Sequence, residues 1–161
     1  MADYTLAQAR QYVAGKIHTL TDAPCHQYRR LVRSKEDLEN LFSIHNEEDN
    51  RLIHGYQMAR VATTNEPDTA EGVIDFTFHR VYRLLIEGYY GLDDSQATEL
   101  TFQAFIETIL DAFDSDPKLG GNCNMTWPME VQAVRDGFYG GYGVHYCELV
   151  LLIRMRRDRI A

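Results

Sequence analysis

The feature that most constrains the fold is a long run of alternating residues, 73–90. Apolar side chains occupy one parity, interrupted only by Arg80: Ile74, Phe76, Phe78, Tyr82, Leu84 and Ile86. Successive side chains of a strand point to opposite faces, so this pattern predicts a strand with one buried face. Strands of globular proteins usually have about 5–6 residues. The extra length indicates that part of this strand reaches beyond its own domain, towards a partner.

Three further segments have the alternation of strands and extend this strand into a sheet. Residues 52–64 are predicted to pair with it as a long hairpin, and the polar residues 64–72 form the hairpin tip. Residues 125–135 and 142–155 are predicted to form a closing hairpin. The glycine-rich residues 136–143 predict a flexible connection that is longer than a minimal hairpin loop.

Two segments have the 3.6-residue period of helices, and both are expected to pack on the sheet. Residues 4–20, with Asp3 as the expected N-cap, carry one apolar stripe: Leu6, Ala9, Val13, Ile17 and Leu20. Residues 93–113, capped by Asp93 or Asp94, carry a dense apolar face. Opposite that face lies a polar stripe at intervals of four: Glu99, Gln103, Glu107 and Asp111.

Residues 24–50 have the weakest pattern and are interpreted as an insertion or loop region. Within them, residues 28–33 are predicted as a short strand, Ser34 as the cap of a helix ending near Phe42, and residues 46–50 as a solvated acidic turn. The whole pattern predicts an α+β fold in a single domain, residues 1–161. Its mixed, mainly antiparallel sheet has a long β-hairpin, and the N-terminal helix and one central helix pack on it.

The composition argues against several classes of protein. A net charge of −8 does not favour nonspecific nucleic-acid binding, which needs clustered positive charge. No apolar run approaches the roughly 20 residues that span a bilayer, and the first residues lack the order of a signal peptide. We therefore expect the protein to be made in a reducing cytosol, and we expect no association with a membrane. Three widely spaced cysteines are expected to be free thiols: Cys25, Cys123 and Cys147.

The residues that could carry chemistry are scattered along the chain. None of the six histidines forms an H-x-x-x-H or H-E-x-x-H motif, and His145 is interpreted as a structural histidine. The glycines of residues 136–143 lack the Lys-Ser/Thr of a phosphate loop and lead into a strand. We therefore predict no catalytic residue, no cofactor and no metal site. The alternative, a small-ligand enzyme or binding domain, requires His145, Arg80 and these glycines to converge on one pocket.

Aromatic and arginine side chains indicate contacts between molecules instead. Arg80 interrupts an apolar parity, which fits either a carboxylate partner in an interface or an edge position. The aromatic residues near the strand ends either form an interface or cap the core. The candidate interface residues are Arg80, Arg83, Tyr89, Tyr90, Phe138, Tyr139, Tyr142, Arg154 and Arg156.

Residues 52–155 contain an ordered set of motifs. They are a strand ending in Ile86-Glu87-Gly88-Tyr89-Tyr90, then Leu92-Asp93-Asp94-Ser95, a helix with Phe102 and Phe105, Leu119-Gly120-Gly121, a Trp127-Pro128 strand, and Gly143-Val144-His145-Tyr146-Cys147-Glu148-Leu149. In this order they resemble the tail terminator (tail completion) proteins of long-tailed bacteriophages and related tail-like particles. These motifs are structural patterns and contain no catalytic signature.

The resemblance implies a small protein with helices on a mixed sheet that forms a homohexameric ring and has no enzymatic activity. Such a ring caps the finished tail tube, stops its polymerisation and offers a docking surface to the head–tail connector or stopper protein. The implied partners are other copies of the chain, the tail tube protein and that connector. The implied location is the virion tail or neck, with the host cytoplasm during assembly. A head-completion or stopper protein of the neck is the alternative.

Overall fold

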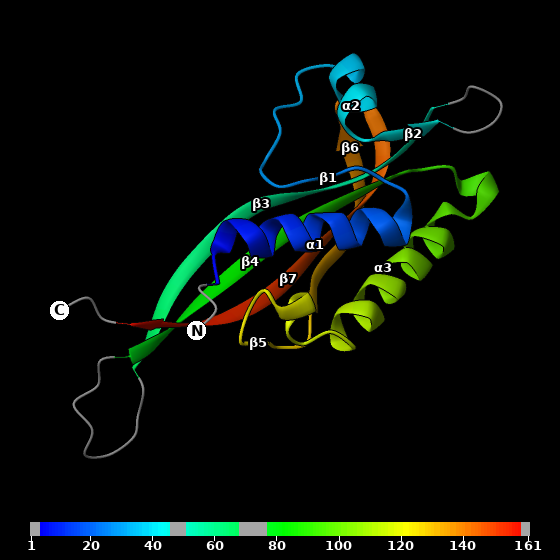
Figure 1. Cartoon of the computed structure of the whole chain (residues 1–161). Coiled ribbons are helices and arrows are strands. Elements are labelled where there is room, and N and C mark those ends of the chain that lie inside the picture. Colours follow the sequence, from blue (N-terminus) through cyan, green and yellow to red (C-terminus); the bar gives the residue numbers. More distant parts are fainter. Residues whose placement is uncertain (1–3, 46–50, 68–76, 159–161) are drawn as a thin grey trace.

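The computed structural model of the chain describes residues 4–45, 51–67 and 77–158 (Figure 1). This part has three α-helices and a mixed sheet of seven strands, which confirms the predicted α+β fold. The helices are α1 (Leu6–Thr21), α2 (Lys35–Leu41) and α3 (Thr98–Asp114), with 3₁₀ turns η1 (Asp94–Gln96) and η2 (Leu119–Gly121). The strands are β1 (Cys25–His26), β2 (Ser43–His45), β3 (Arg51–Pro67), β4 (Thr77–Gly91), β5 (Met125–Thr126), β6 (Glu130–Tyr139) and β7 (Tyr142–Asp158).

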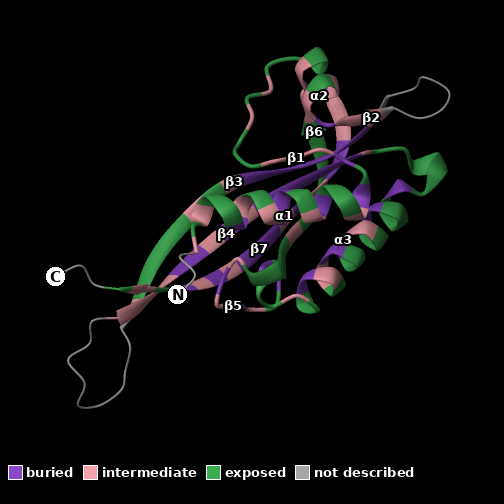
Figure 2. Ribbon diagram, in the orientation of Figure 1, coloured by how far each residue is buried: buried purple, intermediate pink, exposed green. Residues whose placement is uncertain are grey.

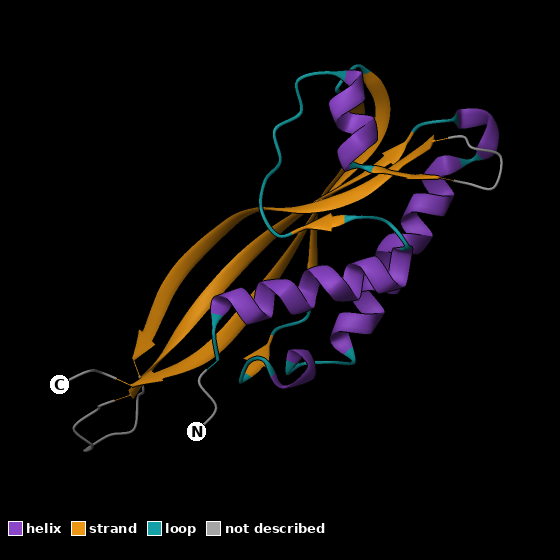
Figure 3. Cartoon of the chain, turned by 45° about the horizontal axis from the view of Figure 1, so that its top comes forward, coloured by secondary structure: helices purple, strands orange, loops and turns teal. Residues whose placement is uncertain are grey.

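Three long antiparallel strands form the centre of the sheet in the order β3-β4-β7 (Figure 3). β1 runs parallel to β3, and β2 pairs antiparallel with the start of β3. β5 and β6 both pair with the far edge of β7. The predicted long hairpin is confirmed as β3 and β4. Residues 64–67, predicted to belong to its tip, instead continue β3, and residues 68–76 lie outside the described part.

One face of the sheet carries the main hydrophobic core, and α1 and α3 cover this face (Figure 2). The alternation predicted for the strands is confirmed on β4 and β7, whose buried residues here include Tyr82, Leu84, Ile86, Cys147, Leu149, Leu151, Ile153 and Met155. From the helices come Val13, Ile17, Phe102, Ile106, Ile109 and Phe113, all at most 2% exposed. Burying one such side chain contributes about 1.5–3 kcal/mol, which fixes the helices on this face.

One end of the three-stranded ribbon extends beyond the helices as an arm, formed by residues 62–67, 77–81 and 154–158, of which Met155 still reaches the main core (Figure 1). A strand under one layer alternates between buried and exposed residues. In β3 four consecutive residues of the arm are all exposed: Ala62, Thr63, Thr64 and Asn65. Among the described residues, nothing pairs with the outer edge of β3 beyond Gln57. The arm therefore has an uncovered strand edge.

Both large helices begin later than predicted, for local reasons. Thr5, not Asp3, is the N-cap of α1, because its hydroxyl accepts a hydrogen bond from the Gln8 backbone N–H at 3.2 Å. Asp93 caps η1 rather than α3, and Ala97 in the left-handed conformation (φ 51°) separates the two. The predicted strand at residues 28–33 is wrong, since this stretch is a loop. No helix in the described part is long and apolar enough to cross a membrane.

The closing hairpin also differs from the prediction. The glycine-rich segment is not a long flexible loop, because β6 continues to Tyr139 and a two-residue turn follows. Gly140 and Gly141 have φ angles of 56° and 83°, as the tightest hairpin turns require. The predicted strand 125–135 is divided into β5 and β6 at Pro128, which has no backbone N–H to donate to β7.

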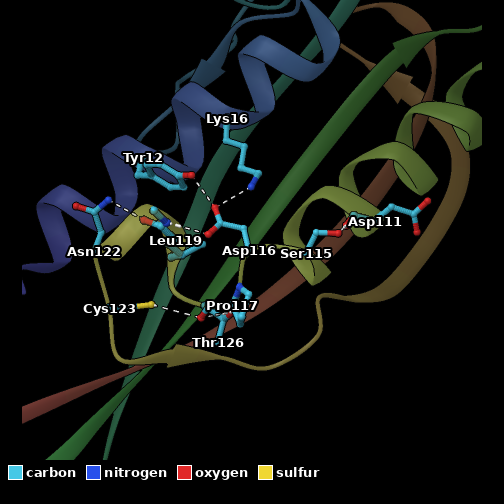
Figure 4. A network of polar contacts seen from close by, with 11 residues as sticks. Tyr12, Lys16, Asp111, Ser115, Asp116, Pro117, Leu119, Asn122, Cys123 and Thr126 are labelled. Atoms are coloured by element: carbon cyan, nitrogen blue, oxygen red, sulfur yellow. Dashed lines mark hydrogen bonds and ion pairs between the residues drawn. The ribbon is translucent and has the colours of Figure 1, made fainter.

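A polar contact fastens α1 to the segment after α3 (Figure 4). Asp116 Oδ2 accepts hydrogen bonds from Tyr12 Oη at 2.6 Å and Lys16 Nζ at 2.8 Å, and Oδ1 accepts from the Gly120 N–H at 2.9 Å. Burial alone would raise the pKa of Asp116, but these donors outweigh it and lower the pKa to about 2. The Asp116 contact therefore holds α1 against the segment that follows α3.

Candidate functional site

The face of the sheet that points away from α1 and α3 is only partly covered, and we call it the open face. On β4 it carries every second residue: Val81, Arg83, Leu85, Glu87 and Tyr89. Only one end is covered, where α2 packs through Leu38 and Phe42 against Tyr89 and Val144 (Figure 3). The strands position these side chains, because the opposite parity is fixed in the core.

Two carboxylates lie directly opposite each other at the centre of the open face. Glu87 on β4 pairs in register with Glu148 on β7, and Gln57 on β3 pairs with Glu87 from the other side. Like charges directly opposite each other in a sheet are destabilising. Glu87 is only 7% exposed, and among the described residues it forms no ion pair. The repulsion between these two carboxylates therefore lowers the stability of the fold unless other groups compensate their charge.

Tyrosine hydroxyls supply part of that compensation. Tyr89 Oη donates to Glu87 Oε2 at 2.7 Å, and Tyr146 Oη donates to Glu148 Oε1 at 2.7 Å. Gln57 Nε2 donates to the same Glu87 oxygen at 3.0 Å. Burial, and then the hydrogen bonds to these carboxylates, raise the pKa of Tyr89 and of Tyr146. Both hydroxyls therefore remain protonated donors.

Above this polar floor lies a hollow of about 540 Å³ with an arginine rim. The rim comes from four segments of the chain: Arg29, Arg60, Arg83 and Arg135. The Arg135 guanidinium lies over the Tyr146 ring at 4.6 Å from its centroid and 3.9 Å from Glu148. Tyr89 and Tyr139 stack at 4.5 Å between ring centroids beside the carboxylates. The hollow thus has anionic groups at its floor and cationic groups at its margin.

This arrangement is suited to binding charged groups of another molecule. Among the described residues, the lining contains no histidine, cysteine, serine or lysine. No group of three or more His, Cys, Asp or Glu side chains there is arranged to hold a metal ion. The three cysteines are free, and burial raises the thiol pKa to about 12 in Cys25, about 11 in Cys123 and about 12 in Cys147. These thiols therefore remain protonated at neutral pH.

The structure brings four of the predicted interface residues together at the hollow: Arg83, Tyr89, Phe138 and Tyr139. Tyr142 lies in the neighbouring cluster under α2, and its hydroxyl donates to Glu39. Tyr90 lies on the opposite face, in the core, where it stacks on Phe102. Tyr90 is therefore separated from the others by the sheet itself.

The three remaining predicted residues lie on the arm. Arg80 is half-buried, its Nε donates to Asn65 Oδ1 at 3.1 Å, and its guanidinium lies over the Phe78 ring. Arg154 Nε lies 3.4 Å from Glu66 Oε2, and Arg156 is exposed. Arg154 and Arg156 therefore extend the positive charge of the open face along the arm, whereas Arg80 lies on the opposite face, on the parity of the core residues.

His145 has a structural environment and does not meet Arg80. Its Nδ1 lies 2.5 Å from Asp136 Oδ1 and its Nε2 lies 2.8 Å from Thr98 Oγ1, so it ties β6 and α3 to β7. Its cross-strand partner Tyr90 is ten residues from Arg80 along β4, about 33 Å. The pocket that the enzyme alternative requires is not formed by these residues.

Sequence reasoning missed four of the residues that give the hollow its charge, Glu87, Arg60, Arg135 and Glu148, and it also missed Gln57, which hydrogen-bonds to Glu87. A signal was present in Glu87, the single acidic residue in the otherwise uncharged run 84–92. Glu87 faces Glu148 because of the register between β4 and β7, and the residue pattern of a single strand gives no information on that register.

Neither a protein-family model nor a curated protein sequence matches the chain. The functional proposal therefore depends on the motifs of the sequence and on the geometry of the open face and the arm.

Proposed function

We propose that the protein is a tail terminator of a phage-like particle. In this role it is a structural virion subunit that forms a homohexameric ring on the end of the tail tube. The ring stops tube polymerisation and provides the surface to which the head connector joins. The motif order over residues 52–155 supports the proposal, and the uncovered arm is the structural observation that carries it.

The arm supports assembly because an isolated chain gains little from it. Residues 62–65 are exposed, and the outer edge of β3 presents unpaired backbone groups beyond Gln57 in the described part. Unpaired strand edges are templates for pairing with another chain, and single-chain proteins usually shorten or cover them. The strands of this ribbon have 15 to 17 residues and extend beyond their own core, and a neighbouring subunit or tube in contact with the arm would account for that length.

The open face supports the same role through its electrostatics. Glu87 and Glu148 face each other, and guanidinium groups surround them without fully pairing. A partner that brings charges of both signs would compensate both the facing carboxylates and the incompletely paired guanidinium groups. Such electrostatic complementarity fixes the register of a contact and the choice of partner.

Purified protein mixed with the tail tube protein of the same particle tests the proposal. We expect electron micrographs to show rings and capped tubes, and tube length to fall as more protein is added. The variant Ala62→Arg/Thr64→Arg, placed on the uncovered arm, should retain its Tm and lose capping. Gln11→Arg, on an exposed position of α1, is the matched control and should cap normally.

A protein that stays monomeric at every concentration and leaves tube length unchanged would contradict the proposal. Binding to the head connector without any effect on tube growth would indicate the stopper role instead.

A further inference from the structure

The outer face of α3 is strongly acidic. No lysine or arginine occurs between residues 84 and 117, and eight acidic residues do: Glu87, Asp93, Asp94, Glu99, Glu107, Asp111, Asp114 and Asp116. Four of them project from α3 and are exposed: Glu99, Glu107, Asp111 and Asp114. We call these four the acidic stripe.

Glu99 lies in the first turn of α3, where negative charge is favourable, but the other three residues of the acidic stripe do not stabilise the isolated chain. Glu107 and Asp111 are four residues apart and Asp111 and Asp114 three apart, spacings at which like charges on a helix repel. Asp111 and Asp114 also lie in the C-terminal turns, where the helix dipole disfavours negative charge and no basic residue compensates. This pattern is accounted for by a positively charged surface that the helix meets outside its own chain.

The open face offers a row of arginines of matching length. Arg154, Arg83, Arg60 and Arg135 lie at successive levels of the sheet, from that of Val81 to that of Tyr89 on β4, and are spread across β7, β4, β3 and β6. Eight residues of strand span about 26 Å. From Glu99 to Asp114 the helix rises by about 22 Å. The two rows of charge are therefore similar in length and opposite in sign.

We propose that the acidic stripe on α3 of one copy docks on the arginine row of the open face of the next copy. This inference rests on the proposed ring and names the two faces that form its subunit contact. Leu100 is 72% exposed beside Glu99, and half-buried Leu85 and Leu152 lie between the arginines, so an apolar contact accompanies the charges.

The acidic groups of the open face offset part of its positive charge, but Glu66, Glu87 and Glu148 are fewer than the four arginines of the row. Glu66 is paired with Arg154 at 3.4 Å, and Glu87 and Glu148 accept hydrogen bonds from tyrosine hydroxyls. Glu130 pairs with Val150 and also lies on the open face, at its β6 edge and away from the middle of the row. Since α3 and the open face lie on opposite sides of the sheet, the contact is head-to-tail, and such a contact closes into a ring when the rotation between copies allows.

Charge reversal on each face tests the inference. The first variant is Glu107→Lys/Asp111→Lys on α3, and the second is Arg60→Glu/Arg83→Glu on the open face. Each alone places like charges across the contact and should weaken ring formation on the order of 100-fold in native mass spectrometry or sedimentation. Mixed in equal amounts, the two should form alternating rings, because every contact then joins opposite charges.

Thermal melts verify that each variant is folded. Where Arg83→Glu lowers the Tm, Arg60→Glu alone, at an exposed side chain, replaces the double variant. Arg33→Glu, in the loop before α2, makes a matched charge change elsewhere and should leave ring formation unchanged.

Folded variants that still form wild-type rings, or that fail to assemble when mixed, would overturn the inference and leave the proposed function standing. A wild-type chain that forms no ring at all would overturn both.

Discussion

His54 makes the stability of the fold depend on pH between about 4 and 6.5. The side chain is fully buried between Tyr56, Tyr90 and Phe105, and burial lowers its pKa to about 4. Its Nε2 lies 2.8 Å from Tyr56 Oη, and Nδ1 has no hydrogen-bond partner among the described residues. A second proton would therefore occupy a nitrogen with no acceptor.

The sign follows from the two pKa values. The His54 imidazole has a pKa of 6.5 in the unfolded chain and about 4 in the native protein. Between these two pH values the unfolded chain binds a proton that the native protein does not bind. The contribution of His54 is therefore complete above pH 6.5 and is lost as the pH falls towards 4. Between pH 7.5 and pH 5 this linkage lowers the free energy of unfolding by about 2 kcal/mol.

Urea unfolding followed by far-UV circular dichroism measures this loss. With a slope of about 2 kcal/mol per molar urea, the midpoint should fall by about 1 M between pH 7.5 and pH 5. In His54→Phe the midpoint should change by about 1 M less over the same range, and other groups such as His26 contribute equally to both proteins. Parallel losses in the wild type and His54→Phe would refute the reasoning.

For three other substitutions the structure predicts whether the stability of the fold rises or falls. Gly88→Ala places a Cβ 2.7 Å from both Cys147 Sγ and the Tyr56 ring, so it should destabilise the fold by about 1–3 kcal/mol in thermal melts, whereas Gly137→Ala, with no atom within 4 Å, should have little effect. Gly15→Ala lies in α1 with no atom within 4 Å and should raise stability by about 0.5–1 kcal/mol; a lower Tm would show that α1 packs differently. Asp116→Asn removes the ion pair with Lys16 and should cost about 1 kcal/mol at pH 7. Because the native pKa of Asp116 is about 2, that difference should persist to about pH 4 and shrink as the pH falls to 2; a difference independent of pH would contradict the assignment.

Local periodicity predicted most of the core. The buried parity of β7 and the apolar face of α3 depend only on which residues follow one another along a chain segment, so both were accessible from sequence. The starts of α1 and α3 were not, because competing caps lie within a few residues. Ala97 adopts φ 51° without being glycine, and no local signal marks it.

The open face was predicted only in part for a different reason. Arg83, Tyr89 and Tyr139 were identified from residue type, but their meeting with Glu87 and Glu148 requires the pairing of strands about 60 residues apart in sequence. Glu87 appears in the strand pattern as one polar residue among apolar ones. Only the register shows that it faces a second carboxylate and a rim of arginines.

The central claim is that this chain assembles into a ring, and native mass spectrometry of the purified protein over a range of concentrations and salt tests it most directly. The account predicts a closed species at six times the 18.6 kDa mass of the chain, with a population that falls as salt screens the contact between α3 and the open face. A single species at 18.6 kDa at every concentration, with or without tail tube protein, would contradict it.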